Sequence, residues 1–273
     1  MPMDDKKIRV EIEGRVATLF LSNPPMNVVT LSLTRQMHAA LDELAADPAI
    51  GALVLTGEGD RAFCAGSDIK EFPRLVAERG IVSQKLGYEN ETYGLVGNFP
   101  KPTVAAIERL ALGGGLELAA GCDLIVASED VQLGLPEVKL GGFPGSGGTV
   151  RVTRRIGLGR ANEMMLLGDM LDAQTALAWG LINRIAPKGQ ALSAARALAA
   201  RLATGPSQAV FACKAALRYA VDLPEGEAIR RTLDLSEALS RTHDFSEGVS
   251  AFIDKRPARF SDPLDVVSFS SAD

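Results

Sequence analysis

The order of strand and helix patterns along the chain constrains the fold most. Apolar residues alternate with charged ones over residues 8–12, which predicts a half-buried strand. Residues 31–46 place apolar side chains at helical spacing. Further runs of strand length lie at residues 16–21, 50–55, 103–107, 123–128 and 131–135. This alternation of strands and helices predicts an α/β body.

The predicted secondary structure changes beyond Gly148. Only residues 181–185 keep a strand pattern there. Helical patterns dominate at residues 191–203, 207–220, 225–240 and 245–252. We therefore predict an α/β body over residues 1–200 and a helical region over residues 201–273.

Composition excludes several classes of protein. A net charge of −5 gives no general attraction to nucleic acid or to an anionic membrane. No apolar run reaches the roughly 18 residues of a membrane helix, and the first residues lack the apolar run of a secretory signal. Cys64, Cys122 and Cys213 are far apart and form no CxxC pair. We therefore expect a cytoplasmic protein with reduced thiols, and no metal site.

Small residues at positions 61–70 follow a predicted strand, which lets a ligand approach the backbone closely. If a helix begins at Ser67, the amide of Ser67 is an unpaired donor that points outward. The competing interpretation is a tight turn with a Ser/Asp helix cap.

Three glycines, Gly113–Gly115, precede an apolar helical pattern that contains Glu117. Such a helix start exposes free amides that suit an oxyanion. Glu117 lies about one helical turn after Gly114, so its carboxylate can lie near that amide. The competing interpretation is a glycine turn into a core helix with Glu117 on the wet side, but the apolar neighbours of Glu117 favour a partly buried carboxylate.

A second carboxylate, Glu137, follows a strand pattern and Pro136, so it is placed at the end of a strand. It could also be an ordinary turn glutamate. The glycine-rich residues 141–148 predict a loop that lies close to another segment. Together, two amides and two carboxylates suit chemistry on an enolate: the amides stabilise the oxyanion, while one carboxylate stays protonated and the other acts as a base. Addition of water to a conjugated double bond requires this set.

Other catalytic classes lack their signatures. Ser67 and Ser146 lie among glycines, but no GxSxG motif is present, and the two histidines, His38 and His243, are expected at a surface or an interface. No GxGxxG fingerprint and no Walker A motif occur. A non-catalytic binding protein is disfavoured because both glutamates are present.

Four segments closely resemble the enoyl-CoA hydratase/isomerase (crotonase) superfamily. They occur in the order and spacing of that family, and the resemblance covers about residues 10–260. The segments are FCAGSDIKEF (63–72), ALGGGLELAAGCDLIVAS (111–128), QLGLPEVKLGGFPGSGGTVRVTRRIG (132–157) and DAQTALAWGLINRI (172–185).

The resemblance implies a crotonase-type spiral of β-β-α turns, with C-terminal helices that assemble a homotrimer or a dimer of trimers. It implies an acyl-CoA substrate, a place in fatty acid metabolism, and no cofactor beyond the coenzyme A of the substrate. By motif position, the oxyanion-hole amides fall on Ser67 and Gly114. Glu117 would activate water, and Glu137 would handle the proton delivered to the α-carbon.

The resemblance also implies a substrate-binding set around the two loops. A basic residue of the C-terminal helices, such as Lys255, would meet the 3′-phosphate, including from a neighbouring subunit. The segment 75–99 is expected to wall the acyl pocket. The other expected contacts are Met26, Asn27, Val28, Arg61, Ala62, Ala65, Gly66, Asp68, Ile69, Lys70, Gly113 and Pro136.

The predicted activity is that of an enoyl-CoA hydratase acting on a trans-2-enoyl-CoA. The alternative is a Δ3–Δ2 enoyl-CoA isomerase or another acyl-CoA lyase on the same scaffold. Two positions depart from the family pattern: Arg109 stands near a position that is commonly a small glycine, and Ser67 replaces a more usual alanine. We expect Arg109 to alter packing behind the glycine-led helix, and the Ser67 hydroxyl to lie near the thioester.

Overall fold

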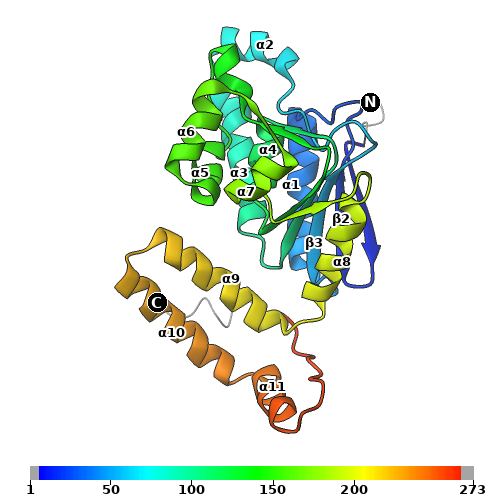
Figure 1. Ribbon diagram of the computed structural model, residues 1–273, viewed down its shortest axis with the longest axis vertical. Coiled ribbons are helices and arrows are strands. Elements are labelled where there is room, and N and C mark those ends of the chain that lie inside the picture. Colours follow the sequence, from blue (N-terminus) through cyan, green and yellow to red (C-terminus); the bar gives the residue numbers. More distant parts are fainter. Residues whose placement is uncertain (1–5, 266–273) are drawn as a thin grey trace.

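The computed structural model describes residues 6–265, and its body contains two sheets (Figure 1). In the larger sheet, β1 and β2 form an antiparallel hairpin and the other neighbouring strands are parallel. Its order is β1 (Ile8–Glu13), β2 (Val16–Leu21), β3 (Ala52–Gly57), β4 (Thr103–Ile107), β6 (Leu124–Ser128) and β9 (Arg184–Ala186). The smaller sheet contains β5 (Leu110–Leu112), β7 (Gln132–Gly134) and β8 (Met170–Asp172).

The chain repeatedly crosses from the larger sheet to the smaller one and then enters a helix. After β4 it forms β5 and then α4 (Gly114–Ala119); after β6 it forms β7 and then the 3-10 helix η3 (Pro136–Leu140). After β3 it makes a single bridge, Cys64 with Ala111, at the corresponding place. These β-β-α turns form the predicted crotonase-type spiral.

Helices cover both faces of the larger sheet. In β3, Leu53 and Leu55 join the core that contains α1 (Leu31–Ala46), whereas Ala52 and Val54 face α8 (Ala191–Ala203). A strand covered on both faces needs apolar residues at successive positions. This explains why β3 was recognisable in the sequence as a continuous apolar run.

The remaining helices of the body lie between these strands in the chain, and Figure 1 shows α3, α4, α5 and α6 grouped on one side of the sheets. No helix within residues 6–265 is long and apolar enough to cross a membrane. The remaining helices of the body are η1 (Ile69–Glu71), α2 (Phe72–Ala77), η2 (Ile81–Leu86), α3 (Gly87–Gly97), α5 (Gly148–Ile156), α6 (Leu158–Leu167) and α7 (Ala173–Trp179).

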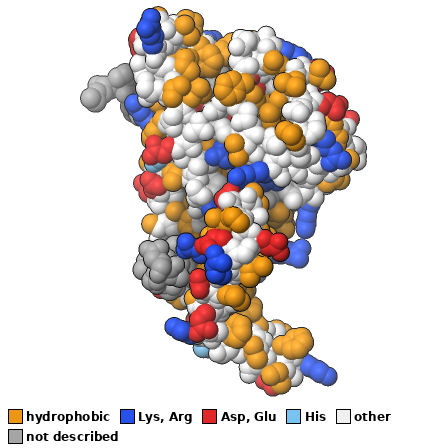
Figure 2. Space-filling view, turned by 90° about the vertical axis from the view of Figure 1, so that its left-hand side faces the viewer, with side chains coloured by type: hydrophobic (Ala, Val, Ile, Leu, Met, Phe, Trp, Pro, Cys, Tyr) orange, Lys and Arg blue, Asp and Glu red, His pale blue; other side chains and the backbone are white. Residues whose placement is uncertain are grey.

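Three further helices form an arm that projects from the body (Figure 1). We call α9 (Ser207–Asp222), α10 (Glu225–Ser240) and α11 (His243–Ile253) the C-terminal arm. Lys214 on α9 holds the arm to the body through an ion pair with Asp123, with 2.7 Å between Nζ and Oδ2. Few side chains of the arm are buried, and Figure 2 shows hydrophobic side chains at its lower end.

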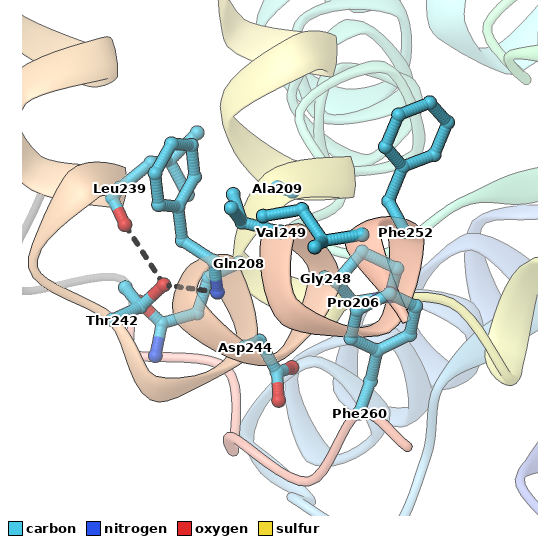
Figure 3. A pocket seen from close by; sticks show the side chains of 12 residues that line it. Pro206, Gln208, Ala209, Leu239, Thr242, Asp244, Gly248, Val249, Phe252 and Phe260 are labelled. Carbon is cyan, nitrogen blue, oxygen red and sulfur yellow. Dashed lines mark hydrogen bonds between the residues drawn. The ribbon is translucent and has the colours of Figure 1, made fainter. Parts of the chain in front are cut away.

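The arm also contains a mainly apolar pocket, drawn in Figure 3, of about 400 Å³. Phe245, Phe252 and Phe260 contribute to its wall. Its carboxylate, Asp244, already accepts hydrogen bonds from the amides of Ser261 and Asp262 through Oδ1. Beside this carboxylate, the side chains of His243 and Asp262 converge with it, so that one nitrogen or oxygen atom of each lies within 4.8 Å of the others.

Several predicted elements need correction. The strand at residues 8–12 exists, but Val10 and Ile12 are 36% and 57% exposed, because no layer of this chain covers that part of the edge strand. The strand predicted at residues 181–185 begins only at Arg184, although Leu181 and Ile182 are buried. The short strands β5 and β8 were not predicted.

Candidate active site

A single parallel bridge brings together residues 61–70 and residues 111–120, which we call the two glycine-led segments. Cys64 pairs with Ala111, and the amide of Leu112 donates to the carbonyl of Cys64 at 3.0 Å. Ser67 and Gly114 each lie three residues beyond a partner of that bridge. A Cβ atom on Gly114 would lie 3.7 Å from the nitrogen of Ser67. The structure therefore brings together the two predicted amide donors.

The amide of Ser67 is available, but not because a helix begins there. Ser67 forms a bridge with Val29, and the 3-10 helix η1 starts at Ile69 after Asp68, whose side chain caps it. In this bridge, the carbonyl of Val29 accepts from Asp68 and the amide of Val29 donates to Gly66, so the amide of Ser67 points away from Val29. It donates to no other described residue.

The glycine turn, Gly113–Gly115, can be formed only by residues without side chains. Gly113 has φ = +50°, a left-handed conformation that favours glycine. A Cβ atom on Gly115 would lie 2.3 Å from the carbonyl oxygen of Cys64. The first amide of α4, that of Gly114, has no acceptor within its own helix and donates to no other described residue.

Glu117 on α4 is 2% exposed, which confirms that this carboxylate is buried. Its Oε1 accepts hydrogen bonds from the amides of Ser146 at 2.8 Å and Gly148 at 2.7 Å. The glycine-rich loop therefore lies against this carboxylate, as its composition predicted. Burial raises the pKa of Glu117 to about 7; the two amides oppose that rise, while the charges of Glu137 and Glu89 add to it.

Glu137 lies in η3, immediately after β7, and approaches the same glycine turn. A Cβ atom on Gly113 would lie 3.0 Å from its Oε1. Its other oxygen, Oε2, is buried and has no hydrogen-bond partner among the described residues. Burial raises the pKa of Glu137 above its usual value, and its own backbone amide opposes the rise.

A third carboxylate, which the sequence did not predict, connects Ser67 with the glycine-rich loop at residues 141–148. Glu89 on α3 is 1% exposed and accepts from the hydroxyl of Ser67 at 3.2 Å and from that of Ser146 at 2.9 Å. The buried Lys85 pairs with it at 3.0 Å and also donates to the carbonyl of Val29. We call Lys85, Glu89, Ser67 and Ser146 the buried polar network.

The network also holds the side chain of Ser67. Its hydroxyl donates to Glu89, and a Cβ atom on Gly114 would lie 3.7 Å from the hydroxyl oxygen as well as from the nitrogen of Ser67. The expectation that this hydroxyl lies near a bound thioester stays a prediction. A sequence signal was present, because Lys85 and Glu89 are opposite charges at i and i+4 in a segment expected to wall a pocket. Their partners, 22 and 57 residues away from Glu89, gave no such signal.

The structure brings some, but not all, of the other predicted binding residues to the two segments. The carbonyl of Met26 accepts from the amide of Ala65 at 3.0 Å, which places residues 26–28 beside residues 61–66. Asn27 is fully buried and donates to the carbonyl of Ala62. Val28 is half-buried, Ala62 and Gly66 are buried, Asp68 and Pro136 are half-buried, and Arg61, Ile69 and Lys70 are exposed.

Two expectations about basic residues meet a different geometry. Arg109 is about half exposed and pairs with Asp130 at 3.0 Å, so its guanidinium does not pack behind α4 as expected. Lys255 follows α11, at the end of the arm, whereas α4 lies in the body (Figure 1). Within one chain, Lys255 is therefore remote from the glycine turn.

Comparison with known proteins covers nearly the whole chain. The family model described as "Enoyl-CoA hydratase/isomerase" matches residues 11–263. A probable enoyl-CoA hydratase of Rhizobium meliloti is 38% identical over 260 residues, which are 94% of this chain and 99% of that protein. The mitochondrial enoyl-CoA hydratase of Pongo abelii is 36% identical over 90% of this chain and 84% of its own length.

Solved structures agree with this result. The crystal structure of an enoyl-CoA hydratase from Bacillus anthracis superposes with a TM-score of 0.89 at 32% identity, covering 93% of this chain and 99% of that one. The family model covers both glycine-led segments, and each of these relatives and this structure matches at least 90% of the chain. The chain therefore belongs to the enoyl-CoA hydratase/isomerase (crotonase) superfamily and has its fold.

Proposed function

We propose that the protein is an enoyl-CoA hydratase, which adds water across the 2,3 double bond of a trans-2-enoyl-CoA. One observation carries the proposal: a buried carboxylate, Glu117, and a half-buried one, Glu137, lie beside a glycine turn whose amide at Gly114 adjoins that of Ser67. Relatives at 33–38% identity that are named as hydratases support it.

In the proposed reaction, the thioester oxygen accepts hydrogen bonds from the amides of Ser67 and Gly114. Glu117 takes a proton from water as the water oxygen bonds to C3, and the electrons of the double bond move to form an enolate. Two donors aimed at this oxygen stabilise the charge that develops on it. The enolate then takes a proton at C2 from Glu137.

The environments of the two carboxylates support this division of work. The amides of Ser146 and Gly148 fix one oxygen of Glu117, which leaves the other to orient a water molecule. The unpaired Oε2 of Glu137 is suited to carry a proton to a carbon atom of the substrate, because no group of the described chain competes for it.

Incubation of the purified protein with crotonyl-CoA tests the proposal. We expect loss of the absorbance of the conjugated enoyl thioester and formation of 3-hydroxybutyryl-CoA, with medium-chain trans-2-enoyl-CoAs as further substrates. If none of these is hydrated while a 3-enoyl-CoA is converted to the 2-enoyl isomer, the protein is an isomerase and the hydratase proposal is wrong.

We also propose that residues 26–28 and 61–70 hold the coenzyme A portion, with the acyl group near α3. For Lys255 to meet the 3′-phosphate, a neighbouring subunit must supply it, since Lys255 is remote from the glycine turn of its own chain. Substitution of Lys255 by Ala should then raise KM for crotonyl-CoA and lower affinity for coenzyme A more than for 3′-dephospho-coenzyme A. Equal losses for both ligands would remove Lys255 from this role.

We further propose that the protein is a homotrimer or a dimer of trimers, assembled through the C-terminal region beyond residue 200. Apolar side chains remain exposed on the arm, among them Leu217, Leu233 and Phe252, at 64%, 62% and 86%. Exposed apolar area of this kind marks interaction surfaces. Sedimentation equilibrium should give a mass of three or six chains; a monomer would contradict the proposal. A cytoplasmic setting stays a prediction.

A further inference from the structure

One buried hydroxyl at the site has no partner. Tyr93 on α3 is fully buried, and its hydroxyl makes no hydrogen bond with any described residue. Across residues 6–265, three buried side-chain polar atoms share this condition: Tyr93 Oη, Glu137 Oε2 and Asp244 Oδ2. Of these, Tyr93 Oη adjoins the glycine turn, and so does the carboxylate of Glu137 through its other oxygen, Oε1. A buried polar atom without a partner costs about 1–3 kcal/mol, so its presence calls for an explanation.

The hydroxyl of Tyr93 lies close to the position that a side chain on Gly114 would occupy. A Cβ atom there would lie 3.3 Å from Tyr93 Oη and 3.7 Å from both the nitrogen and the hydroxyl oxygen of Ser67. The opposite segment is equally close, since a Cβ atom on Gly66 would lie 3.4 Å from the nitrogen of Gly114. The hydroxyl of Tyr93 and the two free amides therefore border one small region.

Burial and the charges of two buried carboxylates, Glu89 and Glu117, raise the pKa of Tyr93, and both carboxylates already accept hydrogen bonds from other donors. Glu89, one turn before Tyr93 on α3, accepts from the hydroxyls of Ser67 and Ser146 and pairs with Lys85. Glu117 receives two amides on Oε1. The phenol of Tyr93 therefore has no acceptor among the described residues.

The phenol is also held in the state that donates. Burial raises the pKa of Tyr93 well above its usual value, and the negative charge of Glu89 adds to the rise. The hydroxyl therefore keeps its proton at neutral pH and can donate to an oxygen that gains negative charge.

We propose that the hydroxyl of Tyr93 is a third hydrogen-bond donor to the thioester oxygen of the substrate, beside the amides of Ser67 and Gly114. The proposal rests on the proposed function, because it assumes that an acyl-CoA thioester binds at the glycine turn. Tyr93 transfers no proton: it donates to the carbonyl oxygen in the bound substrate and more strongly to the enolate oxygen. Tyr93 is then a catalytic residue in addition to the two backbone donors.

The substitution Tyr93→Phe tests the proposal, with Tyr219→Phe as the matched control. Tyr219 lies on α9 in the C-terminal arm, outside the segments proposed to bind the substrate. Loss of one oxyanion donor lowers kcat by roughly 10²–10³-fold, and we expect Tyr93→Phe to lower kcat for crotonyl-CoA by about 10²-fold. Tyr219→Phe should keep kcat within about twofold of wild type. An unchanged kcat in Tyr93→Phe would overturn the proposal.

A spectroscopic readout separates hydrogen bonding from packing. A bound 2,4-hexadienoyl-CoA absorbs at longer wavelength when donors polarise its thioester carbonyl. We expect a clear red shift with wild type and a smaller one with Tyr93→Phe at saturating ligand. A wild-type red shift in the variant would overturn the proposal, even if kcat had fallen.

Stability provides a second check on folding. Because the phenol has no partner in the free protein, Tyr93→Phe should unfold at the same or a higher temperature than wild type. A strongly lowered unfolding temperature would show that the hydroxyl has an internal acceptor, which contradicts the proposal.

The outcomes also separate this inference from the proposed function. If wild type binds the dienoyl ligand with a red shift that Tyr93→Phe reduces, but hydrates no enoyl-CoA, the hydratase proposal is wrong and the role of Tyr93 stands. If wild type hydrates crotonyl-CoA and Tyr93→Phe changes neither kcat nor the shift, only the role of Tyr93 is wrong. Absence of any acyl-CoA binding would overturn both.

Discussion

Glu117 and Glu137 lie beside the same glycine turn, but the chain holds their carboxylates in different ways. The amides of Ser146 and Gly148 fix one oxygen of Glu117. Burial raises the pKa of Glu117, and the charges of Glu137 and Glu89 add to the rise. Glu137 stands at the end of a short strand, with one oxygen unpaired. A carboxylate held by backbone amides keeps a fixed direction, whereas one without partners is free to pass its proton to a substrate. Under the proposed function, two chemically identical side chains have separate tasks because their neighbours differ.

The largest effect on kcat is expected when the charge of each carboxylate is removed in turn. General acid–base groups contribute about 10²–10⁴-fold to rates. Glu117→Gln and Glu137→Gln should each lower kcat for crotonyl-CoA hydration by an amount in that range. If the tasks are separate, Glu117→Gln should still catalyse exchange of the α-proton of a saturated acyl-CoA with solvent deuterium, followed by NMR, while Glu137→Gln should not. The reverse result would exchange the two assignments.

The pH dependence of stability shows which carboxylate carries a costly charge. The pKa of Glu117 is raised to about 7 in the folded protein from a usual value of 4.5. Its contribution to stability is therefore fully present below pH 4.5 and is lost as the pH rises through about 7. We expect wild type to lose about 3 kcal/mol of unfolding free energy from this group between pH 4.5 and 8.

Urea unfolding of wild type and Glu117→Gln at several pH values measures this term. The substitution should flatten the loss of stability in that window. Glu137, whose pKa is also raised, contributes in the same direction and remains in the variant. Equal slopes in wild type and Glu117→Gln would show that Glu117 is charged at little cost.

Gly148→Ala disturbs the environment of Glu117 alone. The added Cβ atom would lie 2.7 Å from Cγ of Glu117, so the carboxylate or the loop must move. Overpacking of this kind costs about 1–3 kcal/mol. We expect a comparable loss of stability and a kcat lowered by roughly 10-fold, since a displaced base loses alignment.

The matched control for that substitution is Gly159→Ala on α6, where a Cβ atom meets nothing within 4 Å. Alanine is the better helix former, so this variant should be equally or slightly more stable with unchanged kcat. A Gly148→Ala variant that behaves like the control would mean that Glu117 tolerates displacement.

Ser67→Ala should give the smallest effect. The substitution removes the hydroxyl that donates to Glu89 but keeps the amide beside Gly114. Ser146 and Lys85 still hold Glu89 in this variant. We therefore expect kcat/KM for crotonyl-CoA to stay within about threefold of wild type, which corresponds to the free energy of one weak hydrogen bond. A loss above tenfold would mean that the hydroxyl of Ser67 sets the position of the amide.

The sequence predicted those features that depend on local pattern or on recognisable motifs. The strand at residues 103–107 and the helices at residues 191–203 and 225–240 have their predicted bounds, because apolar spacing alone specifies them. The family resemblance predicted, by motif position, that the amides of Ser67 and Gly114 lie together. The family resemblance supplied the spiral, which no periodicity in this chain reveals.

Features that depend on contacts between distant residues could not be predicted. Alternation showed that Val10 and Ile12 are apolar, but not that the strand lies at an uncovered edge. The strands β5 and β8 contain three residues each, too few for a period to emerge. Glu89 became part of the site only because Ser67 and Ser146 fold onto it.

The buried pair of Lys85 and Glu89 has a consequence for how this protein can change over generations. Loss of one member of a buried ion pair costs about 3–5 kcal/mol, whereas replacement of both by apolar residues is often neutral. Lys85 also pairs with Glu71, at 2.7 Å. A lineage of such chains therefore meets a barrier at Lys85 or Glu89 alone, and a replacement of both must also accommodate Glu71. The hydroxyls of Ser67 and Ser146 donate to Glu89, so the cost of a substitution at either serine depends on which residues occupy positions 85 and 89. Substitutions at these four sites should consequently be read as one inherited unit.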